Sequence, residues 1–184
     1  MRKALDLLYG AALAGACLAM VAIATLVFIQ VMGRIIDRAL LLAGFSRIGI
    51  AVPSLAEIGG FLFVAASCLA LAPTLRAAVH VRVTLLVRFF GPFGRRVLAA
   101  VVLVLATGLA LFATWFLVKQ AIDAQALGRV SYGLVRIPLW IPQSVMALGF
   151  VIFVIALADE LVTALRGVDP AFRRAEKDRE EGAQ

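Results

Sequence analysis

The sequence is poor in the residues from which catalytic and metal sites are built. Charged residues make up 16% of its 184 residues, His80 is the single histidine, and Cys17 and Cys68 are the two cysteines. One histidine cannot supply both ligands of a bis-histidine haem, and two cysteines outside any CxxC spacing favour neither a zinc site nor a disulfide framework. No GxxxxGK[ST] or GxGxxG motif is present. We therefore expect a non-enzymatic chain without catalytic, substrate-binding or metal sites and without cofactors.

Apolar residues, in contrast, are abundant. Hydrophobic residues make up 64% of the chain and the mean hydropathy is +1.04, whereas apolar residues make up about 45–50% of a soluble domain. A formal net charge of +7 would suggest nucleic-acid binding in a soluble protein. Here the basic residues lie between apolar runs, as residues that flank membrane spans do. The composition predicts an integral membrane protein and no nucleic-acid partner.

Four apolar runs are long enough to cross a bilayer, which takes about 20 residues per helix. They predict an all-α membrane protein with four transmembrane helices at about residues 4–33, 58–75, 97–118 and 139–158. The first run would be about 45 Å long as one helix, so it must tilt in, or protrude from, a hydrocarbon core about 30 Å thick. It continues well beyond Cys17, which favours an uncleaved helix over a lipoprotein signal.

Two segments between these runs are too broken to span and are predicted to be interfacial and amphipathic. Residues 34–52 mix charged and apolar side chains, which is typical of a helix lying in the membrane interface. Residues 79–94 combine basic and aromatic residues with glycine and proline, which favours an interfacial elbow. Residues 1–165 would then form one four-helix membrane domain, followed by a charged cytoplasmic tail over residues 166–184.

The basic residues also predict the orientation, because Lys and Arg near short loops favour the cytoplasmic side. Twelve of the 18 Lys and Arg residues lie on the side of the two termini and of the connection after the second span. The remaining six lie on the other side. Both the N and C termini are therefore expected to be cytoplasmic.

Charged residues at the span ends are candidates for contacts with a partner or with lipid. Ser54 and Glu57 have the spacing of a capping box, in which the serine caps the helix and the glutamate returns a hydrogen bond. The alternative is that Glu57 pairs with Arg34, Arg38 or a partner chain, since a carboxylate near the hydrocarbon edge is stabilised by a cation.

The connection after the second span contains His80 and Arg82. They are expected to be solvated residues that contact the phosphates of membrane phospholipids, because anionic headgroups favour basic residues at the cytoplasmic face.

Small and aromatic residues supply the remaining candidates. Ala11, Gly15 and Ala19 are spaced four apart and form a stripe on which another helix could pack closely. The alternative is a chance arrangement, since small residues are common in membrane helices. Trp140 follows Pro138 at the opening of the fourth span, where it fits the aromatic belt at the headgroups.

The order of these features resembles the small membrane subunit, the Q-type subunit, of the tripartite ATP-independent periplasmic (TRAP) transporters. The resembling residues are Glu57 at the opening of the second span, the run His80–Val83 after it, and the run Ile137–Pro142 that opens the fourth. In length and layout the resemblance covers nearly the whole chain. Thr84 departs from it, because many relatives are expected to carry an acidic residue after the His-x-Arg-Val run, and this puts charge pairing there in doubt.

The resemblance implies a non-catalytic subunit of the bacterial inner membrane that scaffolds a much larger, multispanning M-type subunit. The larger subunit would carry the sodium and substrate sites of a secondary transporter for organic acids of the dicarboxylate or sialic-acid type. A periplasmic substrate-binding protein would deliver the substrate.

Two other functions remain open at this stage. One is a membrane-anchor subunit of a respiratory or other enzyme complex, because such anchors also consist of a few bare helices. The other is a small exporter or channel, which would require polar residues facing a pore within the spans.

Overall fold

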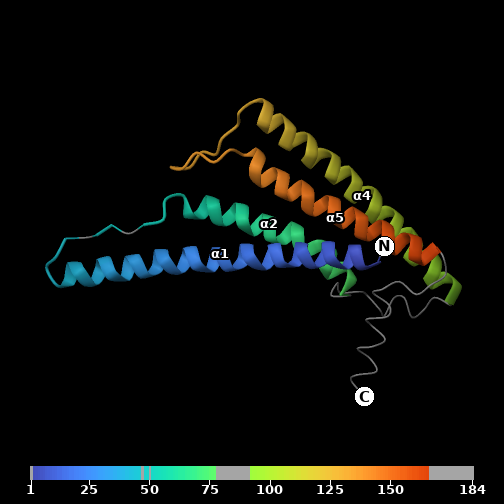
Figure 1. Ribbon diagram of the computed structural model, residues 1–184, viewed down its shortest axis with the longest axis horizontal. Coiled ribbons are helices and arrows are strands. Elements are labelled where there is room, and N and C mark those ends of the chain that lie inside the picture. The colour runs from blue at the N-terminus through green and yellow to red at the C-terminus, as the bar shows by residue number, and fades with distance from the viewer. Residues whose placement is uncertain (1, 47, 50, 78–91, 166–184) are drawn as a thin grey trace, which may run out of the picture.

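The computed structural model describes residues 2–46, 48–49, 51–77 and 92–165. These residues form four helices, α1 (Arg2–Leu42), α2 (Leu55–Arg76), α4 (Pro92–Ala126) and α5 (Trp140–Leu165) (Figure 1). Each helix is long and apolar enough to cross a membrane. The prediction of an all-helical protein with four membrane-spanning helices is therefore confirmed over the described part of the chain.

The first helix extends beyond the span predicted for it. α1 continues through residues 34–42, so this part of the predicted interfacial segment is not a separate helix. Charged side chains alone do not interrupt a helix, and proline, the strongest helix breaker, is absent from α1. The helix ends just before Gly44, which has a φ of 79°. With 41 residues, α1 is about 60 Å long and must tilt or extend beyond the bilayer.

The other helices are also longer than the predicted spans. α4 begins at Pro92, where the missing N–H of proline would be unpaired in any case, and it reaches Ala126. Residues 92–94 of the predicted interfacial elbow thus belong to α4, and residues 79–91 lie outside the described residues. α4 continues for about two turns beyond Lys119, past the predicted end of the span at about residue 118.

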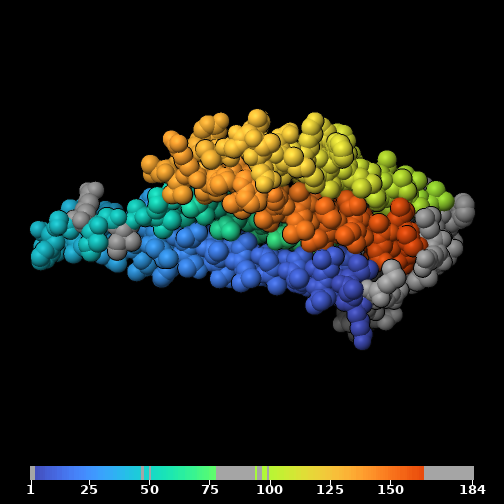
Figure 2. Space-filling model, turned by 45° about the horizontal axis from the view of Figure 1, so that its top comes forward, coloured from blue at the N-terminus to red at the C-terminus, as the bar shows by residue number. Residues whose placement is uncertain are grey.

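The four helices are arranged as an open row in the order α1, α2, α5, α4, in which each helix packs against its neighbours in the row (Figure 1). A closed four-helix bundle would also pack α1 along α4. Because the row leaves its two broad faces uncovered, only 11% to 33% of the most apolar window of each helix is buried. The space-filling view shows the resulting elongated shape (Figure 2).

The contacts along the row are made mainly by small side chains. Ala72 of α2 and Ala156 of α5 are fully or almost fully buried, in a cluster that also contains Ala12 of α1. A Cβ atom added at Gly149 of α5 would lie 2.7 Å from the backbone carbon of Cys68 in α2. Small residues allow helix backbones to approach this closely in membrane proteins.

Successive helices run in opposite directions, so the row has two ends. The Arg76 end contains the starts of α1 and α4 and the last turns of α2 and α5; the Trp140 end contains the opposite ends of the four helices. Figure 1 shows the α1–α2 pair and the α4–α5 pair close together at the Arg76 end and spread apart at the Trp140 end.

Candidate functional site

The described residues do not contain a cluster of three or more His, Cys, Asp or Glu side chains that could hold a metal ion. Cys17 and Cys68 are both free thiols. The polar side-chain interactions that join different segments of this part of the molecule lie at the two ends of the row. An apolar groove lies between the helices near the Trp140 end.

At the Trp140 end, α4 and α5 are joined by a hairpin over residues 130–138, closed by a β-bridge between its first and last residues. The Ser131 N–H donates to the carbonyl of Ile137 at 2.9 Å. The Ser131 hydroxyl donates to the carbonyl of Val135 and accepts from the N–H of Ile137, both at 3.1 Å. Ser131 is 5% exposed. One buried serine thus satisfies three backbone groups and fixes the shape of the hairpin.

The hairpin is attached to the start of α2. The Val135 N–H donates to the Ser54 hydroxyl oxygen at 3.0 Å. Gly133 lies so close to Glu57 and Ser54 that a Cβ atom there would collide with the Glu57 carboxylate and lie 2.6 Å from the Ser54 hydroxyl oxygen. We call these four residues the latch. It connects two segments of the chain that are far apart in the sequence.

The latch overturns the predicted capping box. Ser54 makes no side-chain hydrogen bond to the first turn of α2, and its φ of 55° is left-handed, whereas an N-cap residue usually has an extended backbone. Its hydroxyl oxygen instead accepts the hydrogen bond of the hairpin. The Oε2 atom of Glu57 is buried and has no hydrogen-bond partner. The ion pair found among the described residues joins Asp6 and Arg76, and none joins Glu57 to Arg34 or Arg38, which are both exposed.

Two polar side chains of α1 hold the connection to α2. The Asp37 carboxylate accepts from the N–H groups of Ile48 and Gly49 at 3.0 and 3.1 Å. The Gln30 side-chain oxygen accepts from the N–H of Val52 at 2.6 Å. The charged stretch of α1 thus supplies acceptors to an irregular segment whose N–H groups have no regular partners.

At the Arg76 end, an ion pair joins α1 to α2. The Arg76 guanidinium lies 2.6 Å from the Asp6 carboxylate and 4.9 Å from the ring centroid of Tyr9. The Arg76 side chain is 30% exposed and that of Asp6 is 58% exposed, so water screens the pair. The neighbouring Glu160 of α5 is 2% exposed. Polar groups from three helices therefore meet where the row is narrowest.

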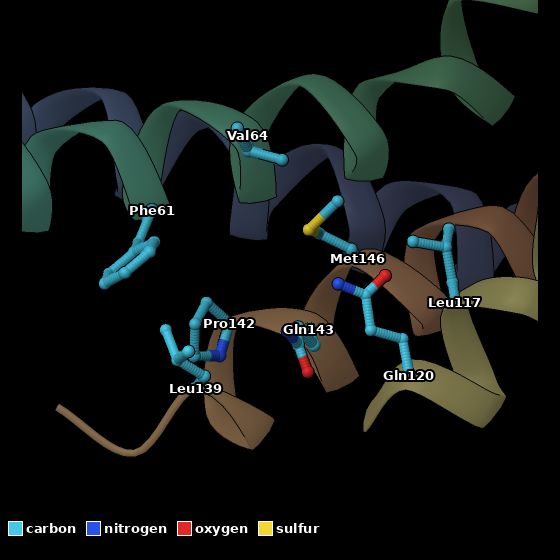
Figure 3. Close-up of a pocket in the computed structure, with 8 residues that line it drawn as sticks. All are labelled: Phe61, Val64, Leu117, Gln120, Leu139, Pro142, Gln143 and Met146. Carbon is cyan, nitrogen blue, oxygen red and sulfur yellow. The ribbon is translucent and has the colours of Figure 1, made fainter. Parts of the chain in front are cut away.

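The groove lies between α2, α4 and α5, near the Trp140 end, and has a volume of about 230 Å³. α5 contributes three of the residues that line it, α2 and α4 contribute two each, and Leu139 directly precedes α5. These are Phe61, Val64, Leu117, Gln120, Leu139, Pro142, Gln143 and Met146 (Figure 3). Six of the eight are apolar. The groove can therefore accept an apolar chain, with two amides as its polar groups.

The structure separates the residues of the predicted small-residue stripe. Ala19 is buried in a cluster with Ala16 and Ala66, and Gly15 faces Leu69 of α2. Ala11 is exposed, because the face of α1 that packs on α2 is rotated from the predicted stripe. The face of α1 that packs on α2 includes Ala16.

The other predicted contact residues are placed as follows. Trp140 is the first residue of α5 and is 39% exposed. His80 and Arg82 lie outside the described residues.

Sequence analysis missed both the ion pair and the orphaned amide in the groove. Asp6 and Arg76 are 70 residues apart, and their contact follows only from the antiparallel packing of α1 on α2. The Oε1 atom of Gln143 is buried without a hydrogen-bond partner. The signal that could have revealed it is a glutamine near the start of a predicted span, where a lipid-facing side chain would be apolar.

In comparison with known families, residues 23–167 match the tripartite ATP-independent periplasmic transporters, DctQ component. The matched residues include α2, α4 and α5 and the second half of α1. Neither the curated proteins nor the solved structures that were compared with the chain contain a match.

Proposed function

Because the chain belongs to the DctQ component family of the tripartite ATP-independent periplasmic transporters, we propose that it is the small, non-catalytic permease subunit of such a transporter. In this role it scaffolds a large, multispanning transport subunit. The observation that carries the proposal is the family match, which covers residues 23–167 and so most of the chain.

The open row of helices supports a scaffolding role. All four helices carry large exposed apolar side chains, such as Phe112 and Trp115 on α4 and Phe28 on α1. Such surfaces are stable only against lipid or another apolar protein. An open row of helices buries little of its own surface and so leaves a wide apolar area for a partner.

The transport chemistry is assigned to the partners. We propose sodium-driven secondary uptake of an organic acid, of the dicarboxylate or sialic-acid type, delivered by a periplasmic substrate-binding protein. The predicted spans of this chain contain almost no ionisable residues, which are the usual groups for binding an ion or an anion inside a membrane. The sodium and substrate sites therefore belong to the large subunit.

The proposed location is the bacterial inner membrane, with both termini cytoplasmic and the Trp140 end periplasmic. The distribution of Lys and Arg supports this orientation. A fusion of a phosphatase that is active only in the periplasm, inserted after Gly128, tests it. An active fusion is expected, and an inactive one would reverse the topology.

Several surface residues are proposed as contacts. Arg34, Arg38 and Trp140 are exposed at or near the Trp140 end, where headgroups and a partner can reach them. Exposed Ala11 offers a small surface for a partner helix. For His80 and Arg82 the proposal rests on the sequence, as contacts with lipid phosphates. Gly15 and Ala19 are left out of this set, because they pack against α2 of the same chain, whereas the half-buried Glu57 stays in it.

Co-purification tests the proposed function. The tagged full chain, extracted with a mild detergent from its native membrane, is expected to retain a large multispanning protein in a defined ratio. A tagged, unrelated inner-membrane protein extracted in parallel is the control. Recovery of the chain without such a partner would contradict the proposal, and a haem Soret band in the purified sample would favour an enzyme-anchor role instead.

A further inference from the structure

The hairpin 130–138 carries two large apolar side chains that the rest of the described chain leaves uncovered. Tyr132 is 103% exposed and Leu134 is 89% exposed, the highest values among the large hydrophobic side chains of the described residues. The contact of the hairpin with α2 uses its backbone, through the Val135 N–H. The two apolar side chains therefore have no part in the packing of the chain on itself.

The hairpin is held in a fixed shape, which keeps these side chains on its outside. Buried Ser131 bonds to the backbone of Val135 and Ile137, and the Leu139 N–H donates to the carbonyl of Arg129 at 3.0 Å. Backbone groups that are paired in this way cost less to bring into a partly apolar environment. The hairpin can therefore enter the interfacial region of a membrane without unfolding.

Two arginines lie beside the apolar pair. Arg129 and Arg136 are both exposed, and neither makes an ion pair or a side-chain hydrogen bond within the part of the chain that the structure describes. Residues 124–158 contain no Asp or Glu. The guanidinium group matches the geometry of a phosphate. This surface is therefore complementary to a partner that presents phosphates next to apolar groups.

The position of the hairpin in the membrane identifies that partner. Its base lies next to Trp140, the first residue of α5, and Val135 bonds to Ser54, which directly precedes α2. In Figure 1 the hairpin accordingly leans toward the start of α2. Because α2 and α5 both begin a candidate span there, the hairpin lies across two span starts, at the headgroup level. Phospholipids present phosphates and apolar chains together at this level.

We propose that the hairpin 130–138 docks on the lipid surface of the membrane. Tyr132 and Leu134 enter the interfacial region, where tyrosine is enriched in membrane proteins. Arg129 and Arg136 bind the phosphates of anionic phospholipids. This docking involves only groups of this chain, so it goes beyond the proposed function and does not depend on it.

The accessibility of a spin label tests the depth of the hairpin. The full chain with Cys17→Ala, Cys68→Ala and a labelled Leu134→Cys is placed, with the partner it retains, in vesicles of phosphatidylethanolamine and phosphatidylglycerol. Oxygen concentrates in lipid, whereas a nickel chelate stays in water. The ratio of oxygen to nickel collisions is expected to be higher for this label than for one on Gln125→Cys, an exposed polar position in the last turn of α4.

Matched arginine variants connect the depth of the label to the phosphates. Arg129→Gln and Arg136→Gln are each expected to lower the ratio of docked to undocked hairpin about fivefold, because each removes a cation that an anionic lipid surface attracts. Arg34→Gln combined with Arg38→Gln, at two exposed arginines of α1, is the control and should leave the collision ratio of the label unchanged.

Frequent collisions with nickel at the Leu134→Cys label would place the hairpin in water, and infrequent collisions with both reagents would place it against a protein. Either result would overturn the proposal, as would a ratio that stays unchanged in both hairpin arginine variants. Slow hydrogen exchange at the Val135 N–H in each variant checks that the hairpin is still formed. The outcomes then report docking and not unfolding.

Discussion

The two ends of the helix row are held together in different ways. At the Arg76 end, alanines such as Ala72 and Ala156 bring the helix backbones close together, and the Asp6–Arg76 ion pair joins α1 to α2. At the Trp140 end, larger side chains such as Phe61 and Met146 keep the helices apart around the groove. There the separated helices are connected by the hydrogen bond from Val135 of the hairpin to Ser54, which directly precedes α2.

The comparison indicates which interactions decide the shape of the molecule. Where small residues let two helix backbones pack closely, the helices are in contact over several turns, and a larger side chain there is poorly tolerated. Hydrogen bonds and an exposed ion pair each contribute about 1 kcal/mol or less. The close contact of α2 with α5 should therefore control global stability, and the latch should control the Trp140 end locally.

The largest effect is expected from Gly149→Ala. The added methyl group would lie 2.7 to 2.8 Å from Cys68 backbone and Cβ atoms, so α2 and α5 must move apart. Overpacking of this kind costs about 1–3 kcal/mol. Thermal unfolding in detergent should show a clear decrease in Tm.

The matched control for that variant is Gly108→Ala, also inside a helix, where an added Cβ meets no atom within 4 Å. Alanine favours a helix over glycine, so the Tm of this variant should be unchanged or slightly raised. A similar decrease in both variants would show that the α2–α5 contact is not what limits stability.

A smaller and local effect is expected from Gly133→Ala. Its methyl group would collide with the Glu57 carboxylate and displace the hairpin from α2. The hydrogen bond from the Val135 N–H to Ser54 should then be lost, at a cost of about 1 kcal/mol. Hydrogen exchange at Val135 should accelerate, while exchange in α2 and α5 near the Arg76 end stays slow.

A second substitution checks the cause of this effect. Glu57→Ala removes the side chain that lies nearest to the added methyl group. In the Gly133→Ala background it should restore part of the protection at Val135. If Val135 exchanges at the wild-type rate in Gly133→Ala alone, the latch does not hold the hairpin.

The smallest effect is expected at the ion pair. A double-mutant cycle with Asp6→Asn and Arg76→Gln should give a coupling free energy of about 0.2–1 kcal/mol, because both side chains are partly exposed. High salt should reduce it. A control cycle combines Asp6→Asn with Arg34→Gln, at an exposed arginine of the same chain, and should show no coupling free energy. Absence of coupling in the first cycle would contradict the pair.

The four helices could be predicted from sequence because apolar runs of this length have few alternatives. Their ends could not. Lys119 and Asp123 on α4 lie beyond the predicted span, and Arg34 and Asp37 on α1 were predicted to belong to a separate interfacial segment, yet the two helices continue through them. Charge marks where a chain leaves the hydrocarbon, whereas a helix ends where its backbone geometry changes, and this occurs at Gly44 and Gly128.

The contacts between helices could not be predicted from the sequence, for a different reason. The spacing of Ser54 and Glu57 fits a capping box, but Val135 of the hairpin, 81 residues away, donates a hydrogen bond to the Ser54 hydroxyl. In the same way, the order of packing in the row decides that Ala16 faces α2 while Ala11 is exposed. A local sequence pattern cannot show a hydrogen-bond partner or a helix contact that forms only when distant segments pack together.

Cysteine cross-linking in native membranes tests the open row most directly. With Cys17 and Cys68 replaced by alanine, Ala72→Cys and Ala156→Cys should cross-link, because both residues lie in one buried cluster of α2 and α5. Ala19→Cys on α1 and Ala110→Cys on α4 should not, because α2 and α5 separate these helices. Efficient cross-linking of the second pair within one chain would indicate a closed bundle and contradict the open row on which the scaffolding role is built.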